Sequence, residues 1–261
     1  MKKRIICLLM AFAVLLSLCS CGVGRYKVVK TVADREYSIA FRNGDTTYHY
    51  IDAALKELSY DGTIENLSYK WFSNGNTVNF PKAKNAISKL GYIEPRTFTI
   101  GADLNSFPMC YVSGNGYTGF DVELARAVCD KLGWQLIVQP IISADAYVEL
   151  NSGNIDCAWG GVVLDEDSVD YTILATYMSD SLVIAAKSNG KGLLANGVLY
   201  IGSEEMYMDV LNENPAVLNR VGQVTRVSGT PTEYFAYLDS NECDFIITTK
   251  SGVEFYNHNS I

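Results

Sequence analysis

The chain lacks the residues and spacings that mark several kinds of catalytic site. It has two histidines in 261 residues: His49 stands before a predicted helix and His258 lies in the terminal tail. No Ser-His-Asp arrangement, phosphate-binding loop or metal-ligand cluster stands out. The seven cysteines form no Cys-x-x-Cys pair, which argues against a zinc or redox motif. We therefore expect no enzyme, no metal and no cofactor.

Basic residues are also scarce. Lysine and arginine number 21 against 29 aspartates and glutamates, so the formal net charge is -8. Three of the basic residues, Lys2, Lys3 and Arg4, crowd at the N-terminus. An acidic body has no electrostatic reason to bind nucleic acid, and the simplest explanation of its acidity is solubility.

The N-terminal residues predict a targeting signal. The apolar run 5–18 follows the basic MKKR and is too short to be a comfortable membrane span, so it predicts a secretion signal. The run ends in LCSCG, which resembles the bacterial lipobox. The resemblance implies cleavage before Cys21 and lipidation of that cysteine, so that residues 1–20 are a lipoprotein signal peptide. Acyl chains on Cys21 would anchor the protein to the outer face of the cell membrane. The alternative is an uncleaved single-span anchor.

Strands and helices alternate from residue 97 onward, which favours parallel sheets in an α/β fold. The segments TFTIGAD, QLIVQPI, IDCAWGGVV, SLVIAAK, VLYIG and DFIITT are predicted strands. Upstream, Tyr37 to Phe41 predicts another strand, and Pro81 opens a predicted helix that Gly91 ends. A polar, glycine-rich break at 188–197 separates two units.

Four cysteines remain beyond the signal segment: Cys110, Cys129, Cys157 and Cys243. Outside the cytoplasm they could be free or paired. Cys129 and Cys157 stand in apolar segments, which is typical of small core residues.

Three segments carry a family resemblance. GYTGFDVELARAVCDKLGW, ELNSGNIDCAWGG and LDSNECDFIITTKSGVEFY occur in that order. They resemble the bacterial solute-binding proteins of family 3, the polar amino-acid receptors of ABC importers. The resemblance implies a two-lobed periplasmic-binding-protein-like fold (type II). It also implies a small-molecule ligand between the lobes and an ABC transporter permease as partner.

The order of the pieces departs from the family. The segments 26–45 and 51–72 resemble the returning strand and terminal helices with which the family's chain ends. We therefore predict a circular permutation, which domains whose termini lie close together tolerate. Residues 21–35 are then tether and crossover strand, 36–187 lobe one with a permuted linker at 73–96, and 188–261 lobe two. A fused receptor fragment and a truncated tandem are the alternatives.

The resemblance also implies a ligand clamp. In the family a guanidinium holds the ligand carboxylate, a lobe-two carboxylate pairs with the ammonium, and aromatic rings flank the side chain. No arginine occurs from residue 161 to 187, and Asp167 stands near the expected place. The candidate ligand-binding residues are Asp103, Ser106, Met109, Ser143, Trp159, Gly160, Gly161, Val163, Asp167, Ser203, Glu205 and Thr249.

Several parts of that clamp are missing together. The hypothesis is an acidic cleft, with Asp103, Asp167, Glu204 and Glu205, which would favour a cationic amine or peptide. Solvated loop carboxylates are the plainer interpretation, and Trp159 is as consistent with the core as with ligand stacking. The predicted function is an extracytoplasmic solute-binding lipoprotein that delivers an amino acid-like or cationic solute to an ABC importer. Alternatives are a degenerate binding, sensor or interaction module and, less favoured, a periplasmic dehydratase-like enzyme.

Overall fold

The computed structural model describes residues 24–75, 77–190, 192 and 196–259. Cys21 and the signal segment lie outside these residues. One mixed sheet of eight strands runs through the described chain in the order β5-β2-β6-β1-β7-β10-β8-β9. The two long central strands are β1 (Tyr26–Arg42) and β7 (Tyr171–Lys187), which pair antiparallel over their whole length.

Lobe one is the half of the molecule around one end of the sheet. Its strands β2, β5 and β6 are parallel to one another, and a small hairpin of β3 and β4 lies beside them. Its further elements are α2 (Tyr48–Tyr60), α3 (Thr63–Phe72), η1 (Ile87–Leu90), β2 (Thr97–Ala102), β3 (Tyr111–Ser113), β4 (Gly116–Thr118), α4 (Phe120–Leu132), β5 (Gln135–Pro140), η2 (Ser143–Asp145), α5 (Ala146–Ser152) and β6 (Cys157–Ala158).

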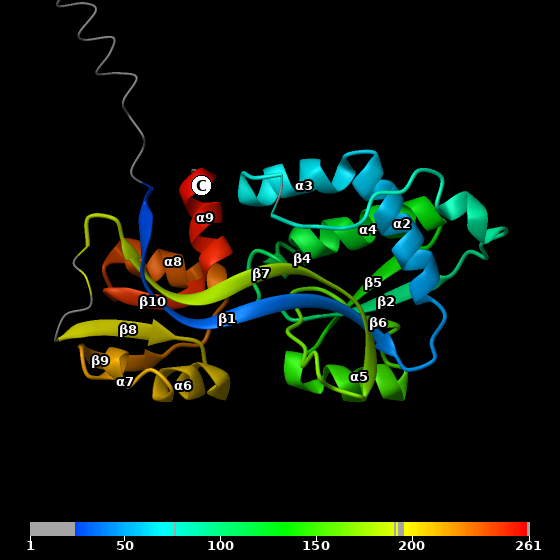
Figure 1. Ribbon diagram of the computed structural model, residues 1–261. Helices are drawn as coiled ribbons and strands as arrows, with labels where there is room; N and C mark the ends of the chain where they lie inside the picture. The colour runs from blue at the N-terminus through cyan, green and yellow to red at the C-terminus, as the bar shows by residue number, and fades with distance from the viewer. Residues whose placement is uncertain (1–23, 76, 191, 193–195, 260–261) are drawn as a thin grey trace, which may run out of the picture.

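Lobe two is built around the other end of the sheet. Its strands β10, β8 and β9 are parallel, and β10 pairs antiparallel with the second half of β7. Its further elements are β8 (Gly197–Ile201), α6 (Glu205–Asn212), α7 (Pro215–Leu218), β9 (Val221–Arg226), α8 (Pro231–Ser240), β10 (Phe245–Thr249) and α9 (Lys250–His258). Figure 1 shows the two lobes connected by the ribbon of β1 and β7.

Helices cover both faces of the sheet, so the inner strands of lobe two are buried on both sides: all residues of β10 and residues 182–186 of β7 are buried. In lobe two, α8 and α9 lie on one face and α6 and α7 on the other (Figure 1). Successive residues of β7 therefore pack on opposite faces of the sheet: Val183 packs with α8, and Ile184 packs with α6 and α7. Lobe one has its largest core under α2, α3 and α4, with a smaller one under α5. Two-sided burial explains why these two segments of lobe two show no alternation of buried and exposed residues.

Two predicted elements are wrong in extent. The helix expected from Pro81 to Gly91 is only the short turn η1, Ile87–Leu90, none of whose residues is buried. Only Ile87 of this turn packs, partly buried, against the large core of lobe one, so the segment has little tertiary packing to stabilise a longer helix. The strand expected at 155–163 is reduced to Cys157–Ala158, because the backbone bends at Gly160 (φ 140°) and Gly161 (φ 68°).

The C-terminal helix α9 belongs to lobe two by sequence but also packs on lobe one. Its Phe255 stacks on Trp71 of α3, with ring centroids 5.4 Å apart, and meets Phe107 edge-on at 5.2 Å. Phe255 is accordingly part of the large core of lobe one. This contact fixes the two lobes against each other on the side of the sheet that carries α9.

Candidate functional site

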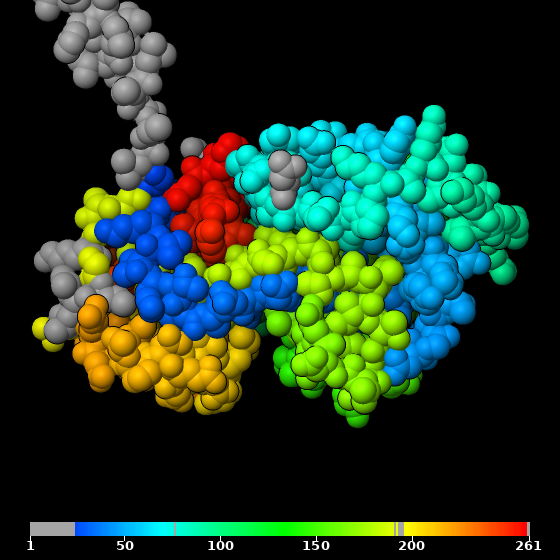
Figure 2. All heavy atoms as spheres, viewed as in Figure 1, coloured from blue at the N-terminus to red at the C-terminus, as the bar shows by residue number. Residues whose placement is uncertain are grey.

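A hollow separates the lobes on the side of the sheet opposite α9. Figure 2 shows it between the α6 side of lobe two and the α5 side of lobe one. The ribbon of β1 and β7 forms its floor, because these are the strands that run from one lobe to the other in the described chain. Interlobe clefts are common binding places for small ligands. We therefore take this hollow as the candidate site.

Three of the predicted residues meet in one hydrogen-bond network on the lobe-one side. Asp103 follows β2 and is nearly buried. Its carboxylate accepts from the Ser143 hydroxyl at 2.7 Å and from the backbone N–H groups of Ser143 and Asn105. The Ser143 hydroxyl in turn accepts from the Val163 N–H at 3.2 Å. The structure thus brings Asp103, Ser143 and Val163 to one place.

The Gly160–Gly161 turn is fixed by its neighbours. A Cβ at Gly161 would lie 2.3 Å from the Cβ of Ser106, and its φ of 68° also favours glycine. The Ser106 hydroxyl donates to the Gly161 carbonyl at 2.6 Å. The Gly161 N–H donates to Asp121 at 2.7 Å. Ser106 and Asp121 thus fix the backbone of the Gly160–Gly161 turn, and these residues are all buried.

Other predicted residues lie in the interior. Met109 and Trp159 have no exposed surface and belong to the large core of lobe one, so the structure favours the core interpretation of Trp159. Thr249 is also buried. Its hydroxyl donates to the Phe107 carbonyl across the lobes and accepts from the Gly252 N–H at 3.0 Å, which caps α9. Their roles in this structure are packing and capping.

The remaining predicted residues are exposed: Asp167, Ser203 and Glu205. Glu205 forms an ion pair with Arg226 at 2.8 Å, so its negative charge is balanced by this arginine. Its neighbour Glu204 differs, because its Oε2 atom is buried and has no hydrogen-bond partner within the described chain. Of the acidic groups expected in the cleft, Asp103 is held by hydrogen bonds, and Glu204 has a buried oxygen without one among the described residues.

The sequence did not predict a buried arginine that lies near Asp103 and against α6. Arg35 of β1 is only 7% exposed, and its guanidinium contacts the Met206 sulfur of α6 at 3.7 Å. Burial, the largest influence, lowers its pKa, but Tyr37, Tyr207 and Asp103 around it raise the pKa above the usual value. A signal existed: Arg35 shares the side of β1 that Tyr37, Ile39 and Phe41 occupy, where a charge is unusual.

Asp121 forms a second buried polar group beneath the Gly160–Gly161 turn. Its carboxylate accepts from the Tyr177 hydroxyl at 2.6 Å and from the Gly161 N–H. Burial raises the pKa of Asp121 to about 7, although the hydrogen bonds from the Tyr177 hydroxyl and the Gly161 N–H act in the opposite direction. Asp121 faces the turn from the core, so its role is to hold that turn.

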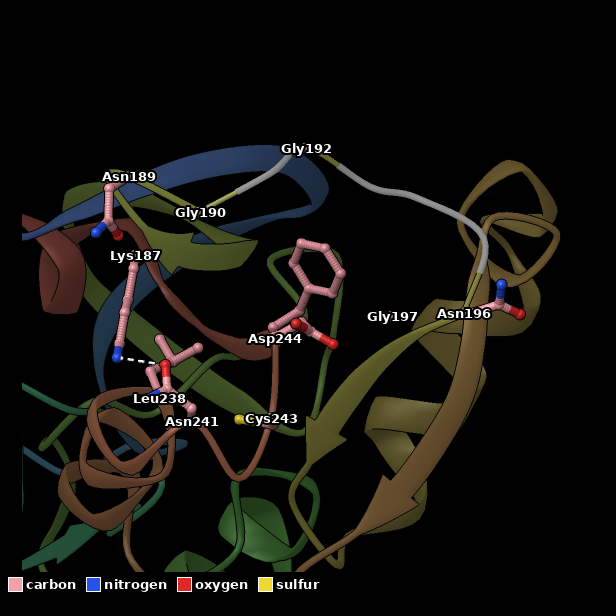
Figure 3. A pocket seen from close by; sticks show the side chains of 11 residues that line it. Lys187, Asn189, Gly190, Gly192, Asn196, Gly197, Leu238, Asn241, Cys243 and Asp244 are labelled. Atoms are coloured by element: carbon pink, nitrogen blue, oxygen red, sulfur yellow. Dashed lines mark hydrogen bonds between the residues drawn. The ribbon is translucent and has the colours of Figure 1, made fainter.

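A cavity of about 400 Å³ lies elsewhere, at the outer end of lobe two (Figure 3). The polar groups around it already have partners. The Lys187 ammonium donates to the Asp239 carbonyl and to the Asn241 side chain, and Asp244 accepts from the Val198 N–H at 2.8 Å. No charged group there lacks a partner in the described part of the chain, so we do not place the site there.

Within the described residues, no group of side chains could hold a metal ion and no helix is long and apolar enough to span a membrane. Cys110, Cys129, Cys157 and Cys243 are free and buried. For Cys129 and Cys157 this confirms the expected place in the core. It also leaves all four thiols out of the hollow between the lobes.

Two lobes, a connecting pair of strands and a polar hollow define a two-lobed α/β binding-protein fold. The chain belongs to the bacterial extracellular solute-binding proteins, family 3, whose family model matches residues 98–227. That range contains Asp103, Ser143 and the Gly160–Gly161 turn. Arg35 lies outside it.

Individual relatives are distant. An ABC transporter substrate-binding protein from Streptococcus pneumoniae, solved with bound histidine, is 23% identical with a TM-score of 0.47, over 63% of this chain and 70% of that one. A polar amino acid ABC transporter protein from Streptococcus thermophilus is 24% identical with a TM-score of 0.39, over 59% and 61%. Membrane-bound lytic murein transglycosylase F of Photobacterium profundum is 30% identical over 87 residues. That match spans 33% of this chain and 17% of the relative.

Proposed function

We propose that this protein is an extracytoplasmic solute-binding lipoprotein that holds one small solute between its lobes and delivers it to an ABC importer. The observation that carries the proposal is the hollow between the lobes. Its floor is the pair of strands that connects them, and polar groups reach it from β1, from Asp103 of lobe one and from the start of α6 in lobe two. A solute there would contact both lobes, which is how hinge closure couples to binding.

The solute classes under this proposal are amino acid-like compounds and cationic amines or peptides. Asp103 and Glu204 support a cationic group on the solute, and Arg35 supports an anionic one. A compound carrying both charges would satisfy all three residues. The family match is consistent with this choice.

Thermal unfolding of the full chain with a panel of solutes tests the proposal. The panel contains the twenty L-amino acids, polyamines, simple amines and short cationic peptides. A ligand at a hundredfold its dissociation constant stabilises the folded state by about 2.7 kcal/mol, which gives a clear shift. Stabilisation by one compound class supports solute binding. No shift with any compound favours an interaction or sensor module instead.

Membrane attachment through Cys21 is a separate part of the proposal. It rests on the basic, apolar and LCSC segments of the sequence, since residues 1–23 are not described. The test is a Cys21→Ser variant expressed in a bacterium that lipidates secreted proteins. We expect wild-type protein to fractionate with membranes and the variant to be released. Retention of the variant in the membrane fraction contradicts lipidation at Cys21.

We also propose that the chain is a circular permutation of the family order. Support comes from the two ends of the described chain: Tyr26 and Asn257 exchange hydrogen bonds of 2.8 Å, although 231 positions separate them. Figure 1 shows the start of β1 beside α9. A rearranged chain, with residues 24–72 attached after residue 258, would restore the family order. It should fold with the ligand affinity of the original, and failure to fold would count against the permutation.

A further inference from the structure

The described chain begins at a point that lobe two holds firmly. Tyr26 at the start of β1 is only 2% exposed, and its backbone exchanges hydrogen bonds of 2.8 Å with the side chain of Asn257 in α9. Its ring meets Phe235 of α8 edge-on, with ring centroids 4.8 Å apart. Its hydroxyl donates to the Asp239 carboxylate at 2.8 Å. The start of β1 is therefore fixed to lobe two by contacts with α8 and α9.

Little chain lies between this point and the cysteine that is proposed to carry lipid. Gly22 and Val23 are the residues between Cys21 and Gly24. Even a fully extended chain spans at most about 11 Å over these three steps, whereas a domain of this size is roughly 45 Å across. With a lipid on Cys21, the start of β1 therefore lies close to the headgroups. The tether is too short to let any chosen face of the protein turn toward them.

Basic side chains gather at the same end of lobe two. Arg25 forms an ion pair with Asp239 at 2.5 Å, and the Lys187 ammonium donates to the Asp239 carbonyl at 2.9 Å. The Lys27 ammonium donates to the Ser188 carbonyl at 3.3 Å, and the Ser188 N–H donates to the Arg25 carbonyl at 2.9 Å. This network, which we call the basic end, joins three bases to one acid in a chain of net charge -8. Anionic headgroups attract such a cluster and repel the acidic remainder of the protein.

The hollow between the lobes lies on another side of the molecule. Figure 1 shows the start of β1 beside α9, and Figure 2 shows the hollow between the α6 side of lobe two and the α5 side of lobe one. From the basic end, β1 runs along the ribbon and pairs with β6 of lobe one at Ala40. A bilayer at the basic end thus contacts lobe two and leaves the hollow and lobe one free of lipid.

We propose that the basic end of lobe two rests on the phospholipid headgroups, so that lobe one is the lobe farther from the bilayer and the hollow opens to the solvent. This inference rests on the proposed lipidation of Cys21. The short tether holds the basic end in place, and its lysines and arginine contact anionic headgroups. Because lobe two is fixed at the membrane, closure of the hinge moves lobe one.

The test uses the full lipidated chain on vesicles, with a fluorophore on one introduced cysteine at a time. Ser240→Cys places the label at the basic end, on the last residue of α8. Asn66→Cys and Ser152→Cys place it on α3 and α5 of lobe one, and all three positions are exposed. The four cysteines of the described chain are buried, which leaves the introduced thiol to react. Energy transfer to an acceptor on the lipid headgroups measures the distance of each label from the bilayer, and denaturant unfolding verifies that each variant is folded.

With the native tether, transfer should be strongest from Ser240→Cys and severalfold weaker from Asn66→Cys and Ser152→Cys, because lobe one extends away from the bilayer. An extended form of the protein carries about twenty additional glycine and serine residues before Gly24, which raises the average reach to roughly 25 Å. On neutral phosphatidylcholine vesicles, the three labels of this extended form should give similar transfer, because its tether no longer sets the orientation.

The extended form also isolates the contribution of the basic side chains. Its Ser240→Cys label should transfer more on phosphatidylglycerol than on phosphatidylcholine vesicles, because anionic lipid attracts the basic end. Arg25→Gln should reduce that gain. Arg126→Gln, at an exposed arginine of α4 in lobe one, is the charge-matched control and should leave the gain unchanged. An equal gain in the two variants would contradict the contact between the basic end and the headgroups.

Two further results would overturn the inference while the proposed lipidation survives. One is equal transfer from Ser240→Cys and from either label on lobe one with the native tether. The other is that the extended form keeps the native order of transfer on phosphatidylcholine, since the tether then does not set the orientation. If the wild-type chain leaves the vesicles as readily as Cys21→Ser, the proposed lipidation fails, and this inference fails with it. The two failures are therefore distinguishable.

Discussion

Asp121 gives the sharpest prediction about stability. It has no exposed surface, and it holds the Gly160–Gly161 turn through its hydrogen bond from the Gly161 N–H. Burial raises its pKa from 3.8 to about 7. Between these two pKa values the folded state keeps the Asp121 proton, whereas the unfolded state has already released it. Stability must fall as the pH rises through it.

The size of the effect follows from the shift. Each pKa unit corresponds to about 1.4 kcal/mol, so a shift from 3.8 to about 7 amounts to about 4 kcal/mol. The favourable contribution is complete below pH 3.8, where both states are protonated, and it is lost as the pH rises through 7. Above about pH 8, ionised Asp121 imposes the full cost on the folded state.

Urea unfolding from about pH 4 to about pH 8 measures this cost. Asp121→Asn removes the titration, and Asp130→Asn, an exposed position on the same helix, is the control. Asp180 and Glu254 also have raised pKa values because of burial, so the wild-type curve alone does not isolate Asp121. The difference between wild type and Asp121→Asn should change by about 4 kcal/mol across the range. Parallel curves for the two proteins would refute the reasoning.

Three further predictions concern packing. Thr249→Val removes the hydrogen bond to the Phe107 carbonyl and the cap of α9. The free energy of unfolding, measured by denaturant titration, should therefore fall by about 1–2 kcal/mol. No change would mean that neither hydrogen bond stabilises the fold. Gly119→Ala places a Cβ 2.2 Å from the Met109 carbonyl oxygen, at a backbone φ of 134°. The substitution should lower the free energy of unfolding by at least about 2 kcal/mol in the same assay. A neutral result would contradict this geometry. Iodoacetamide labelling followed by peptide mapping should leave the four buried cysteines unmodified until denaturant is added: Cys110, Cys129, Cys157 and Cys243. Burial blocks access to these thiols and raises their pKa values. Rapid labelling of the native protein would disprove their burial.

The sequence predicted elements best where one strong local pattern coincided with burial. The helix ending at Leu132 carries apolar residues at helical spacing and a glycine at its C-cap, with φ 70°, and the structure confirms it. The segment after Pro81 has similar local signals, but of its η1 turn only Ile87 packs against the core, and only partly buried, so it does not form the expected helix. Local signals alone did not distinguish the two cases, because helix stability depends mostly on tertiary packing.

The candidate site shows the same division. The order of family-like segments placed Asp103, Ser143 and the Gly160–Gly161 turn near one another, since each follows a strand or precedes a helix of a known pattern. The same reasoning placed Met109 beside the ligand and left Trp159 open between the ligand and the core, yet both are fully buried in the core of lobe one. A shift of one residue in a strand or turn reverses the direction of a side chain, which sequence spacing does not resolve.

By itself the sequence determined the α/β class, the family and the segments that form the hollow, because these depend on periodicity and short motifs. The tertiary structure alone decided which charges share that hollow. Arg35 is far along the chain from both Asp103 and Tyr207, and the three meet only because β1 passes between β6 and β7 in the sheet. Strand order depends on the packing of the whole chain, and so does the pairing of a buried cation with the groups around it.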